Sequence, residues 1–259
     1  MRSRVLAGEI LFGFFMFTDS PSNMEIVSRT GLDWILVDLE HGTANEAVLL
    51  PMLMAAEGTG CTPLVRVEQG SRIRVGRALD LGARGIMVPQ VHSADDARAV
   101  ARWMRTQPAG ERGIALFTRG MDYGAPGHDG VASRHEELLS IIQIESGGAL
   151  AHADEIAAVD GVDVLFVGPT DLSHALGIPG RLDAPAYEEA VDRVASAAKR
   201  AGKAAGVLLW DPEDVGRYAA RGYTFFGISS EAMTLDRAVR AAQQRARQAA
   251  ADATRVGTT

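Results

Sequence analysis

Short apolar runs alternate with longer amphipathic stretches along almost the whole chain. This alternation is typical of βαβ units around a parallel sheet. Most of the apolar runs lack polar alternation, as expected for strands that are covered on both faces. Eight runs therefore predict strands: Ile10–Phe17, Trp34–Leu39, Pro63–Val67, Gly85–Val88, Ser140–Ile144, Val162–Val167, Ala204–Leu209 and Tyr223–Ile228.

The stretches between these runs have helical spacing and helix start signals. Ala94–Trp103 follows Ser93, a good N-cap residue, and Pro185–Lys199 and Pro212–Ala220 both begin with proline in the first turn. Eight strands with intervening helices predict a single (β/α)8 TIM barrel domain over residues 1–259. A doubly wound open sheet is the alternative architecture.

Two further segments allow more than one interpretation. The connection Arg105–Gly130 is long and rich in Gly, Pro and charge, so it is either an active-site flap or plain surface. The stretch Leu235–Val256 is rich in Ala and Arg and has high helix propensity. It is either the final barrel helix with a frayed tail or a helix that packs on a neighbouring subunit.

Composition narrows the class of protein. A hydrophobic share of 47% is typical of a globular protein, and a net charge of -7 argues against nucleic-acid and anionic-membrane binding. Cys61 is the only cysteine, which favours a cytoplasmic setting and a buried structural thiol. The apolar N-terminal run lacks a signal-peptide cleavage site, and no stretch approaches the ~18 apolar residues of a membrane span.

Polar side chains follow the carboxyl ends of several predicted strands, which is the rim where β/α barrels carry their active sites. His41 follows the second strand, Arg66 closes the third, Gln143 and Glu145 end the fifth, and Asp171 follows the sixth. Taken singly, His41 and Arg66 are also compatible with structural roles. Around one opening, however, a cation, an arginine and a histidine are the groups that hold an enolate and move a proton.

Glu145 and Asp171 follow consecutive strands, so their carboxylates can approach one point. Two carboxylates suit a hard divalent ion such as Mg²⁺ or Mn²⁺. The alternative for each acidic residue is a helix N-cap. Ser146-Gly147-Gly148 suggests a plain helix start more strongly than a phosphate site.

These residues resemble the HpcH/HpaI family of class II, metal-dependent pyruvate aldolases. The resemblance extends from Gly13 to about Leu235. The segments that carry it are Gly31–His41, Val65–Val67, Ala78–Pro89, Gly110–Gly113, Gln143–Ser146 and Asp163–Ser173. It implies a carbon-carbon lyase that adds pyruvate, or a related 2-oxo acid such as hydroxypyruvate, to an aldehyde.

The resemblance also implies roles for individual residues. Glu145 and Asp171 would bind a divalent metal ion (Mg²⁺, Mn²⁺ or Co²⁺), and Arg66 and Gln143 would contact the 2-oxo acid. The pocket would be lined by Gly168, Pro169 and Leu208. No lysine Schiff base is required.

By the same resemblance, His41 would pair with Asp80 for proton transfer. Asp80 lies late in the helix after the third strand, towards the rim opposite the mouth, and cannot easily reach its own His41. The consistent solution is that Asp80 reaches a neighbour's site in a homo-oligomer, a hexamer by resemblance.

The chain departs from the family pattern in Thr106–Ala109 and Leu116–Tyr123, so the aldehyde acceptor stays open. One rival is a related acyl-CoA lyase or citrate-type synthase on the same barrel. A CoA-using enzyme should have basic residues near the mouth to bind the phosphates, and no clear cluster is evident beyond Arg112 and Arg119. A second rival is a catalytically silent barrel that serves as a scaffold.

Overall fold

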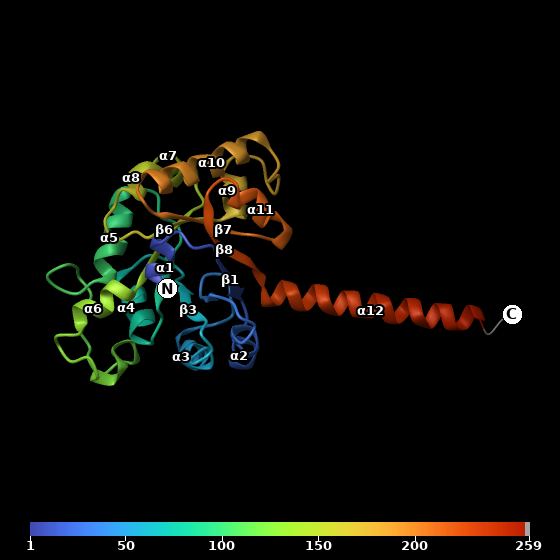
Figure 1. Cartoon of the computed structure of the whole chain (residues 1–259), viewed down its shortest axis with the longest axis horizontal. Helices are drawn as coiled ribbons and strands as arrows, with labels where there is room; N and C mark the ends of the chain where they lie inside the picture. The colour runs from blue at the N-terminus through green and yellow to red at the C-terminus, as the bar shows by residue number, and fades with distance from the viewer. Residues whose placement is uncertain (257–259) are drawn as a thin grey trace.

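Eight parallel strands form a closed barrel, in sequence order, in the computed structural model, which describes residues 1–256 (Figure 1). The predicted TIM barrel is confirmed and the open-sheet alternative is wrong. The observed strand ends differ from the predicted ones by at most two residues. The last three residues of the predicted domain, 257–259, lie outside the described part of the chain. The strands are β1 (Leu11–Met16), β2 (Trp34–Asp38), β3 (Thr62–Arg66), β4 (Gly85–Val88), β5 (Leu139–Ile144), β6 (Val164–Val167), β7 (Ala204–Leu208) and β8 (Tyr223–Ser230).

Helices precede or follow the strands, and most of them cover the outside of the barrel, whereas the last one projects away from it. They are α1 (Arg2–Leu6), α2 (Pro21–Ser28), α3 (Glu46–Ala55), α4 (Arg72–Asp80), α5 (Ala94–Met104), α6 (Val131–Glu137), α7 (Gly147–Ala151), α8 (Ala153–Ala157), α9 (Pro169–Ala175), α10 (Pro185–Arg200), α11 (Val215–Ala219) and α12 (Glu231–Val256). Ser93 caps α5 as predicted, since its side chain accepts from Asp96 N. The helix predicted over Pro212–Ala220 is instead a 3-10 turn, η2 (Pro212–Asp214), followed directly by α11; the Asp211 side chain caps the turn by accepting from Glu213 N.

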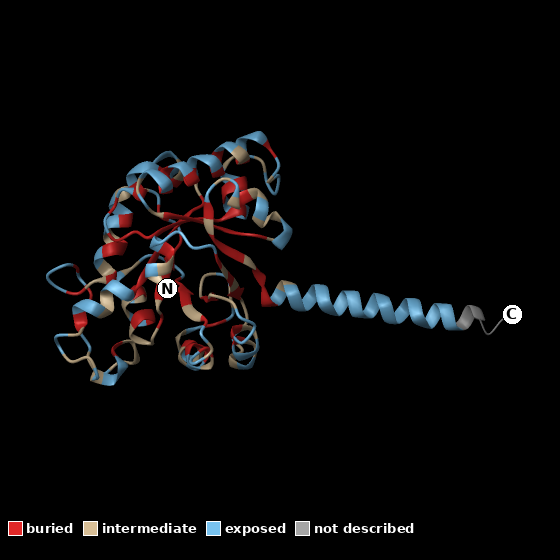
Figure 2. Ribbon diagram, in the orientation of Figure 1, coloured by how far each residue is buried: buried red, intermediate tan, exposed pale blue. Residues whose placement is uncertain are grey.

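The core consists of two layers separated by the strands, most of whose residues are buried (Figure 2). Along β2, Leu36 points into the barrel interior, whereas Ile35 and Val37 point outwards against the helices. Each strand therefore needs apolar residues at both alternate sets of positions. This explains why the strand sequences are continuous apolar runs.

Aromatic rings fill the barrel interior. Trp34 of β2 stacks on Phe225 of β8 with a ring separation of 4.5 Å and an interplanar angle of 1°. Gly13 of β1 leaves the space for Trp34, because a Cβ atom at Gly13 would lie 1.9 Å from Trp34 Cδ2. The indole ring of Trp34 therefore fits inside the barrel only because β1 has no side chain at Gly13.

The connection Arg105–Gly130 does not cover the mouth of its own barrel. The interpretation of this connection as a flap over that mouth is therefore wrong. It contains the 3-10 turn η1 (Arg119–Gly124), which packs against the end of α4: a Cβ atom at Gly120 would lie 2.1 Å from Leu79 O. This is the amino-terminal rim, opposite the candidate site. Cys61 lies on the same rim and is buried, as predicted, and burial raises the pKa of its thiol to about 12.

The C-terminal helix α12 begins at Glu231, four residues before the predicted start, and projects away from the barrel (Figure 1). It is therefore not a final barrel helix, and it is exposed along almost its whole described length (Figure 2). Leu235 and Val239 lie one turn apart on it and are 60% and 59% exposed. Within residues 1–256, no helix combines the length and the apolar character that crossing a membrane requires.

We expect Gly13→Ala to lower the free energy of unfolding by about 3 kcal/mol, because the added methyl group overlaps the Trp34 ring. Gly76→Ala is the matched control. Gly76 lies inside α4 with nothing within 4 Å of an added Cβ, so alanine should stabilise the protein by about 0.5–1 kcal/mol. Chemical denaturation measures both changes, and equal effects would contradict the packing explanation.

Candidate active site

A cavity of about 190 Å³ opens at the carboxyl ends of the strands. Seven of the nine residues singled out from the sequence line it: His41, Arg66, Gln143, Gly168, Pro169, Asp171 and Leu208. Glu145 lies directly beside it, hydrogen-bonded to Gln143, whereas Asp80 lies on the opposite rim. Parallel strands bring these residues together because all their carboxyl ends meet at one rim.

Arg66 is held by a buried bidentate ion pair with Asp38. Its Nε lies 2.9 Å from Asp38 Oδ1 and its Nη2 lies 2.5 Å from Oδ2, and Asp38 has no exposed surface. Burial alone would lower the pKa of Arg66, but its hydrogen bonds to Asp38 and the charges of Asp38, Glu40 and Glu145 raise it. The guanidinium is therefore a fixed positive charge, and its Nη1 is directed towards Gln143 Oε1 at 3.3 Å.

Glu145 is oriented by donors on both carboxylate oxygens. Gln90 N–H donates to Oε1 at 2.8 Å, and Gln143 Nε2 donates to Oε2. Gln90 adopts a left-handed backbone conformation with φ of 55°, which is uncommon for a residue other than glycine. A Cβ atom at Gly168 would lie 2.7 Å from Gln143 Nε2 and 3.0 Å from Glu145 Oε2, so only glycine leaves room for this pair.

The mouth carries more negative charge than its own residues neutralise. Burial raises the pKa of the Glu145 carboxyl, and the neighbouring Glu40 and Asp171 carboxylates add to the rise against the opposing effects of Gln90 and Arg66. Burial also raises the pKa of Glu40, and Asp38 and Asp171 reinforce that shift while Arg66 opposes it. Crowded carboxylates of this kind are stabilised by a bound cation.

The residues at the mouth fit a hard divalent ion. Glu145 and Asp171 supply carboxylate oxygens, and the buried Glu40 Oε2 accepts no hydrogen bond, although it lies 3.2 Å from Arg66 Nη1. Among residues 1–256, no cluster of three or more His, Cys, Asp and Glu side chains has the geometry to hold a metal ion. Two carboxylates would leave the remaining positions to water and substrate, which is the coordination that Mg²⁺ favours.

Neither acidic residue serves as a helix N-cap. Ser146 caps α7 by accepting from Ala149 N, so Ser146-Gly147-Gly148 is a plain helix start, as favoured from the sequence. Asp171 lies inside the first turn of α9, whose N-cap is Gly168, and its side chain is exposed at the mouth. The N-cap alternative is therefore wrong for both Glu145 and Asp171.

His41 and Asp80 are placed very differently. The His41 side chain is 59% exposed at the mouth, with Nε2 3.8 Å from Glu40 Oε2. Asp80 ends α4 on the opposite rim, where its Oδ1 accepts from Arg112 Nη2 at 2.6 Å. The Arg112 side chain is 7% exposed, so the carboxylate of Asp80 is held against the barrel by a nearly buried cation.

Lysine is absent from the mouth. The sequence contains only two lysines. Lys199 lies in the last turn of α10, and Lys203 directly precedes β7, so both lie on the amino-terminal rim. A Schiff base between a lysine and a 2-oxo acid in this cavity is therefore ruled out by position.

The sequence reasoning missed several residues of the site. Asp38 and Glu40 both lie within the segment Trp34–His41, but only contacts across the barrel show what they do. Phe15, Phe17, Phe166 and Trp210 form an aromatic wall of the cavity, and Arg66 lies over the Phe15 ring, 5.5 Å from its centroid. The sequence signal available for Asp38 and Glu40 was that both are charged residues close to His41, which had already been singled out as a site residue.

The chain is similar to known proteins over nearly its whole length. A hydroxypyruvate/pyruvate aldolase from Delftia acidovorans is 39% identical, over 89% of this chain and 86% of the relative. The crystal structure of a HpcH/HpaI aldolase/citrate lyase family protein from Burkholderia cenocepacia superposes with a TM-score of 0.90 at 34% identity, covering 95% of this chain and 98% of that one. The citrate synthase SbnG superposes with a TM-score of 0.87 at 26% identity, covering 96% and 98%.

The profile of the HpcH/HpaI aldolase/citrate lyase family matches residues 11–238, which contain the barrel and every residue of the cavity. Together with the identity to the curated relative, this match fixes the protein class. The chain belongs to the HpcH/HpaI aldolase/citrate lyase family and is a carbon-carbon lyase of the aldolase type.

Proposed function

We propose that the chain catalyses the reversible aldol addition of pyruvate or hydroxypyruvate to an aldehyde, which gives a 4-hydroxy-2-oxo acid. Glu145 and Asp171 would hold a divalent metal ion, Mg²⁺, Mn²⁺ or Co²⁺. The single observation that carries the proposal is the juxtaposition of crowded carboxylates with the fixed cation Arg66 around one small cavity. The named substrates come from the Delftia acidovorans relative.

Different residues of the cavity would bind the 2-oxo acid and stabilise the charge that develops on it. When bound, the metal ion supplies Lewis acidity that makes the C3 protons of the 2-oxo acid removable. Arg66 would donate to the C2 oxygen as negative charge develops there, with its orientation fixed in advance by Asp38. Gln143 would bind the same acid, and the backbone beside Gly168 and Pro169 would lie near its carboxylate.

His41 would move the proton on the C4 hydroxyl, removing it in cleavage and returning it in synthesis. Its exposure at the mouth leaves room for a water between the imidazole and the substrate. Asp80 of a neighbouring subunit would fix the His41 tautomer. This assignment requires a homo-oligomer, for which the family resemblance implies a hexamer.

The exposed helix α12 supports an assembled state. It follows β8, the position at which a barrel usually adds its last covering helix, yet it extends away from its own barrel. Leu235 and Val239 are left exposed on this helix of 26 residues, and helices in proteins gain most of their stability from packing an apolar face. We propose that α12 packs on a neighbouring subunit.

The acyl-CoA lyase or citrate-type synthase is less well supported. Its candidate phosphate ligands are Arg112 and Arg119, but Arg112 is bound to Asp80 and Arg119 to Glu57 at 2.8 Å. Both lie on the rim opposite the cavity. Assays with pyruvate plus an aldehyde and with acyl-CoA thioesters distinguish the two activities.

We expect Glu145→Gln to abolish metal-dependent exchange of pyruvate methyl protons in deuterated water, with a fall of more than about a hundredfold. NMR follows the exchange without any aldehyde. Chelation should remove the wild-type activity and added Mg²⁺ or Mn²⁺ should restore it. The control is Glu155→Gln on α8, outside the cavity. Exchange that survives both Glu145→Gln and chelation would refute the metal-dependent reaction.

We expect Asp38→Asn to raise the KM for pyruvate and to lower the free energy of unfolding by about 3 kcal/mol, because Arg66 loses its buried counter-charge. The control is Glu25→Gln, which breaks an exposed pair with Arg29 and should change stability by less than about 1 kcal/mol. Similar stability losses in both variants would show that the buried pair has no special role.

We expect the His41→Asn and Asp80→Asn variants each to be inactive in aldol cleavage, and co-expressed subunits of the two to recover activity. In a randomly mixed oligomer, about a quarter of the sites would combine an intact His41 with a neighbour's intact Asp80. Cleavage rates of purified mixed oligomers measure the recovery. If both residues act within one subunit, mixing restores nothing.

A further inference from the structure

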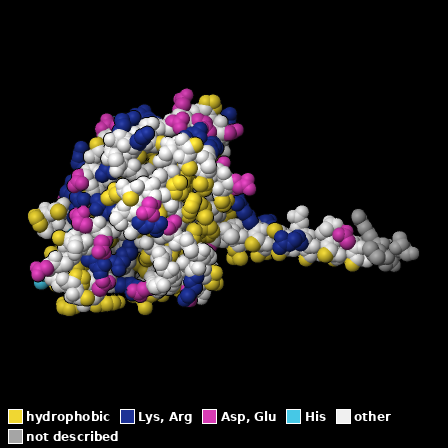
Figure 3. Space-filling view, viewed as in Figure 1, with side chains coloured by type: hydrophobic (Ala, Val, Ile, Leu, Met, Phe, Trp, Pro, Cys, Tyr) yellow, Lys and Arg dark blue, Asp and Glu magenta, His cyan; other side chains and the backbone are white. Residues whose placement is uncertain are grey.

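A second cavity, of about 420 Å³, lies on the amino-terminal rim, opposite the candidate active site. Its walls come from the loop before β3, the loop before β4 and the turn η1, and they include Cys61, Arg84, Arg119 and Tyr123. Basic side chains gather with acidic ones over the region of α4 (Figure 3). The proposed aldol reaction uses none of these cavity residues.

Within the part of the chain that the structure describes, the Arg84 guanidinium makes no hydrogen bond, although the side chain is only 36% exposed. Its one ion-pair contact is Asp122 Oδ1, 3.8 Å from Nη2, which is too long for a hydrogen bond. The Asp122 carboxylate is already bound closely by Arg134, and Glu57 is bound by Arg119. The guanidinium of Arg84 therefore faces the cavity rim with its five donors unused.

Positive charge is also in excess around Arg84. Burial lowers the pKa of its guanidinium, and the neighbouring Arg134 and Arg119 lower it further against the opposing charges of Glu137 and Glu57. Arg134 Nε is buried without a hydrogen bond. An added negative charge would relieve this crowding.

The turn that closes the cavity has an unusual backbone. Asp122 and Tyr123 are consecutive non-glycine residues in the left-handed region, with φ of 44° and 52°. Such conformations cost free energy and are concentrated at ligand sites and other functional turns. Here they place Asp122 and Tyr123 on the cavity wall opposite the loop that contains Cys61.

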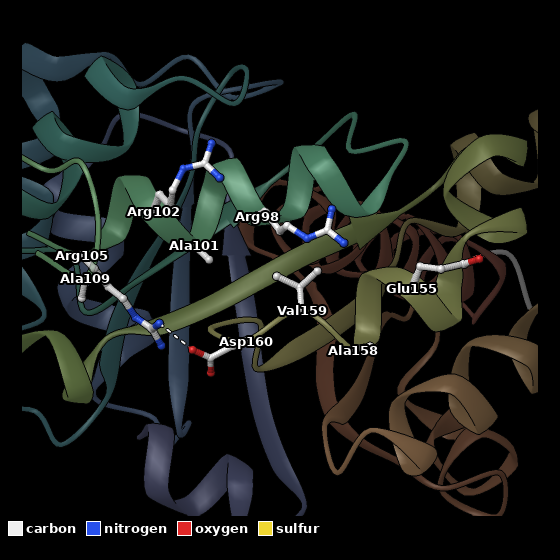
Figure 4. A pocket seen from close by; sticks show the side chains of 9 residues that line it. All are labelled: Arg98, Ala101, Arg102, Arg105, Ala109, Glu155, Ala158, Val159 and Asp160. Carbon is white, nitrogen blue, oxygen red and sulfur yellow. Dashed lines mark hydrogen bonds and ion pairs between the residues drawn. The ribbon is translucent and has the colours of Figure 1, made fainter.

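Another arginine-lined groove on the surface shows the contrast. A groove of about 410 Å³ between α5 and α8 is lined by Arg98, Arg102 and Arg105 (Figure 4). There Arg105 binds Asp160 at 3.0 Å, and Arg98 and Arg102 bind acidic partners of their own. Among the residues that the structure describes, that groove has no arginine without an acidic partner, whereas the guanidinium of Arg84 lies beside its cavity without a hydrogen bond.

We propose that the cavity beside Arg84 is a binding site for a small oxyanion, whose phosphate or carboxylate oxygens the Arg84 guanidinium holds in a bidentate manner. A planar guanidinium with free parallel donors matches both kinds of oxygen pair. The proposal concerns the rim opposite the candidate active site of the same subunit, the rim that also carries Asp80, and its test does not require aldolase activity.

The test is calorimetric titration of the full-length protein, without added divalent metal ion or pyruvate, with inorganic phosphate and with malonate at ionic strength held constant with sodium chloride. We expect saturable binding of at least one anion. Binding should be at least about tenfold weaker in Arg84→Gln and intermediate in Arg84→Lys, which keeps the charge but loses the paired donors. Arg98→Gln, an exposed arginine outside the cavity, should bind as wild type does.

The relative affinities identify the ligand class, because tighter phosphate binding indicates a phosphorylated ligand and tighter malonate binding indicates a carboxylate. Arg84→Lys also guards against misfolding of Arg84→Gln, since it keeps the positive charge. Absence of saturable binding to the wild type overturns the proposal. Unchanged affinity in both Arg84 variants also overturns it, because the anion would then lie elsewhere.

Discussion

The buried pair of Arg66 and Asp38 is the interaction on which the mouth of the barrel depends. It joins the ends of β3 and β2 and fixes a guanidinium where water is largely excluded. A buried ion pair costs desolvation and adds little net stability compared with apolar packing. Its value here is orientation, because Gln143 and the carboxylate of Glu40 are both arranged around Nη1 of that arginine.

The surplus of acidic groups complements this fixed cation. Arg66 is satisfied mainly by Asp38. Burial, reinforced by the neighbouring carboxylates, raises the pKa values of Glu40 and Glu145 against the opposing charge of Arg66. The protein therefore stores electrostatic repulsion at the point where a divalent ion and an anionic substrate would relieve it. Because both lysines lie on the opposite rim, the negative charge that develops on the substrate would be stabilised by Arg66 and the proposed metal ion.

The barrel and the polar residues of its cavity could be predicted from local sequence patterns, whereas Gly168, Pro169 and Leu208 were assigned to the pocket only by the family resemblance. Continuous apolar runs define the strands, and the residue after each strand necessarily reaches the same rim. The partners Asp38 and Glu40 could not be assigned, because their roles depend on distances between strands far apart in sequence. The direction of α12 was equally inaccessible, since helix propensity specifies a helix but not the surface that covers it.

Two features that look unrelated in one chain point to the same requirement. Asp80 is held by Arg112 on the rim opposite its own His41, and α12 leaves uncovered the barrel from which it starts. A nearly buried arginine that fixes a partly exposed carboxylate suits a residue presented to another surface. An isolated amphipathic helix likewise gains most of its stability from packing. A second copy of the chain would satisfy both at once, as the proposed homo-oligomer requires: one barrel would supply the metal site and its neighbour the carboxylate that orients the histidine.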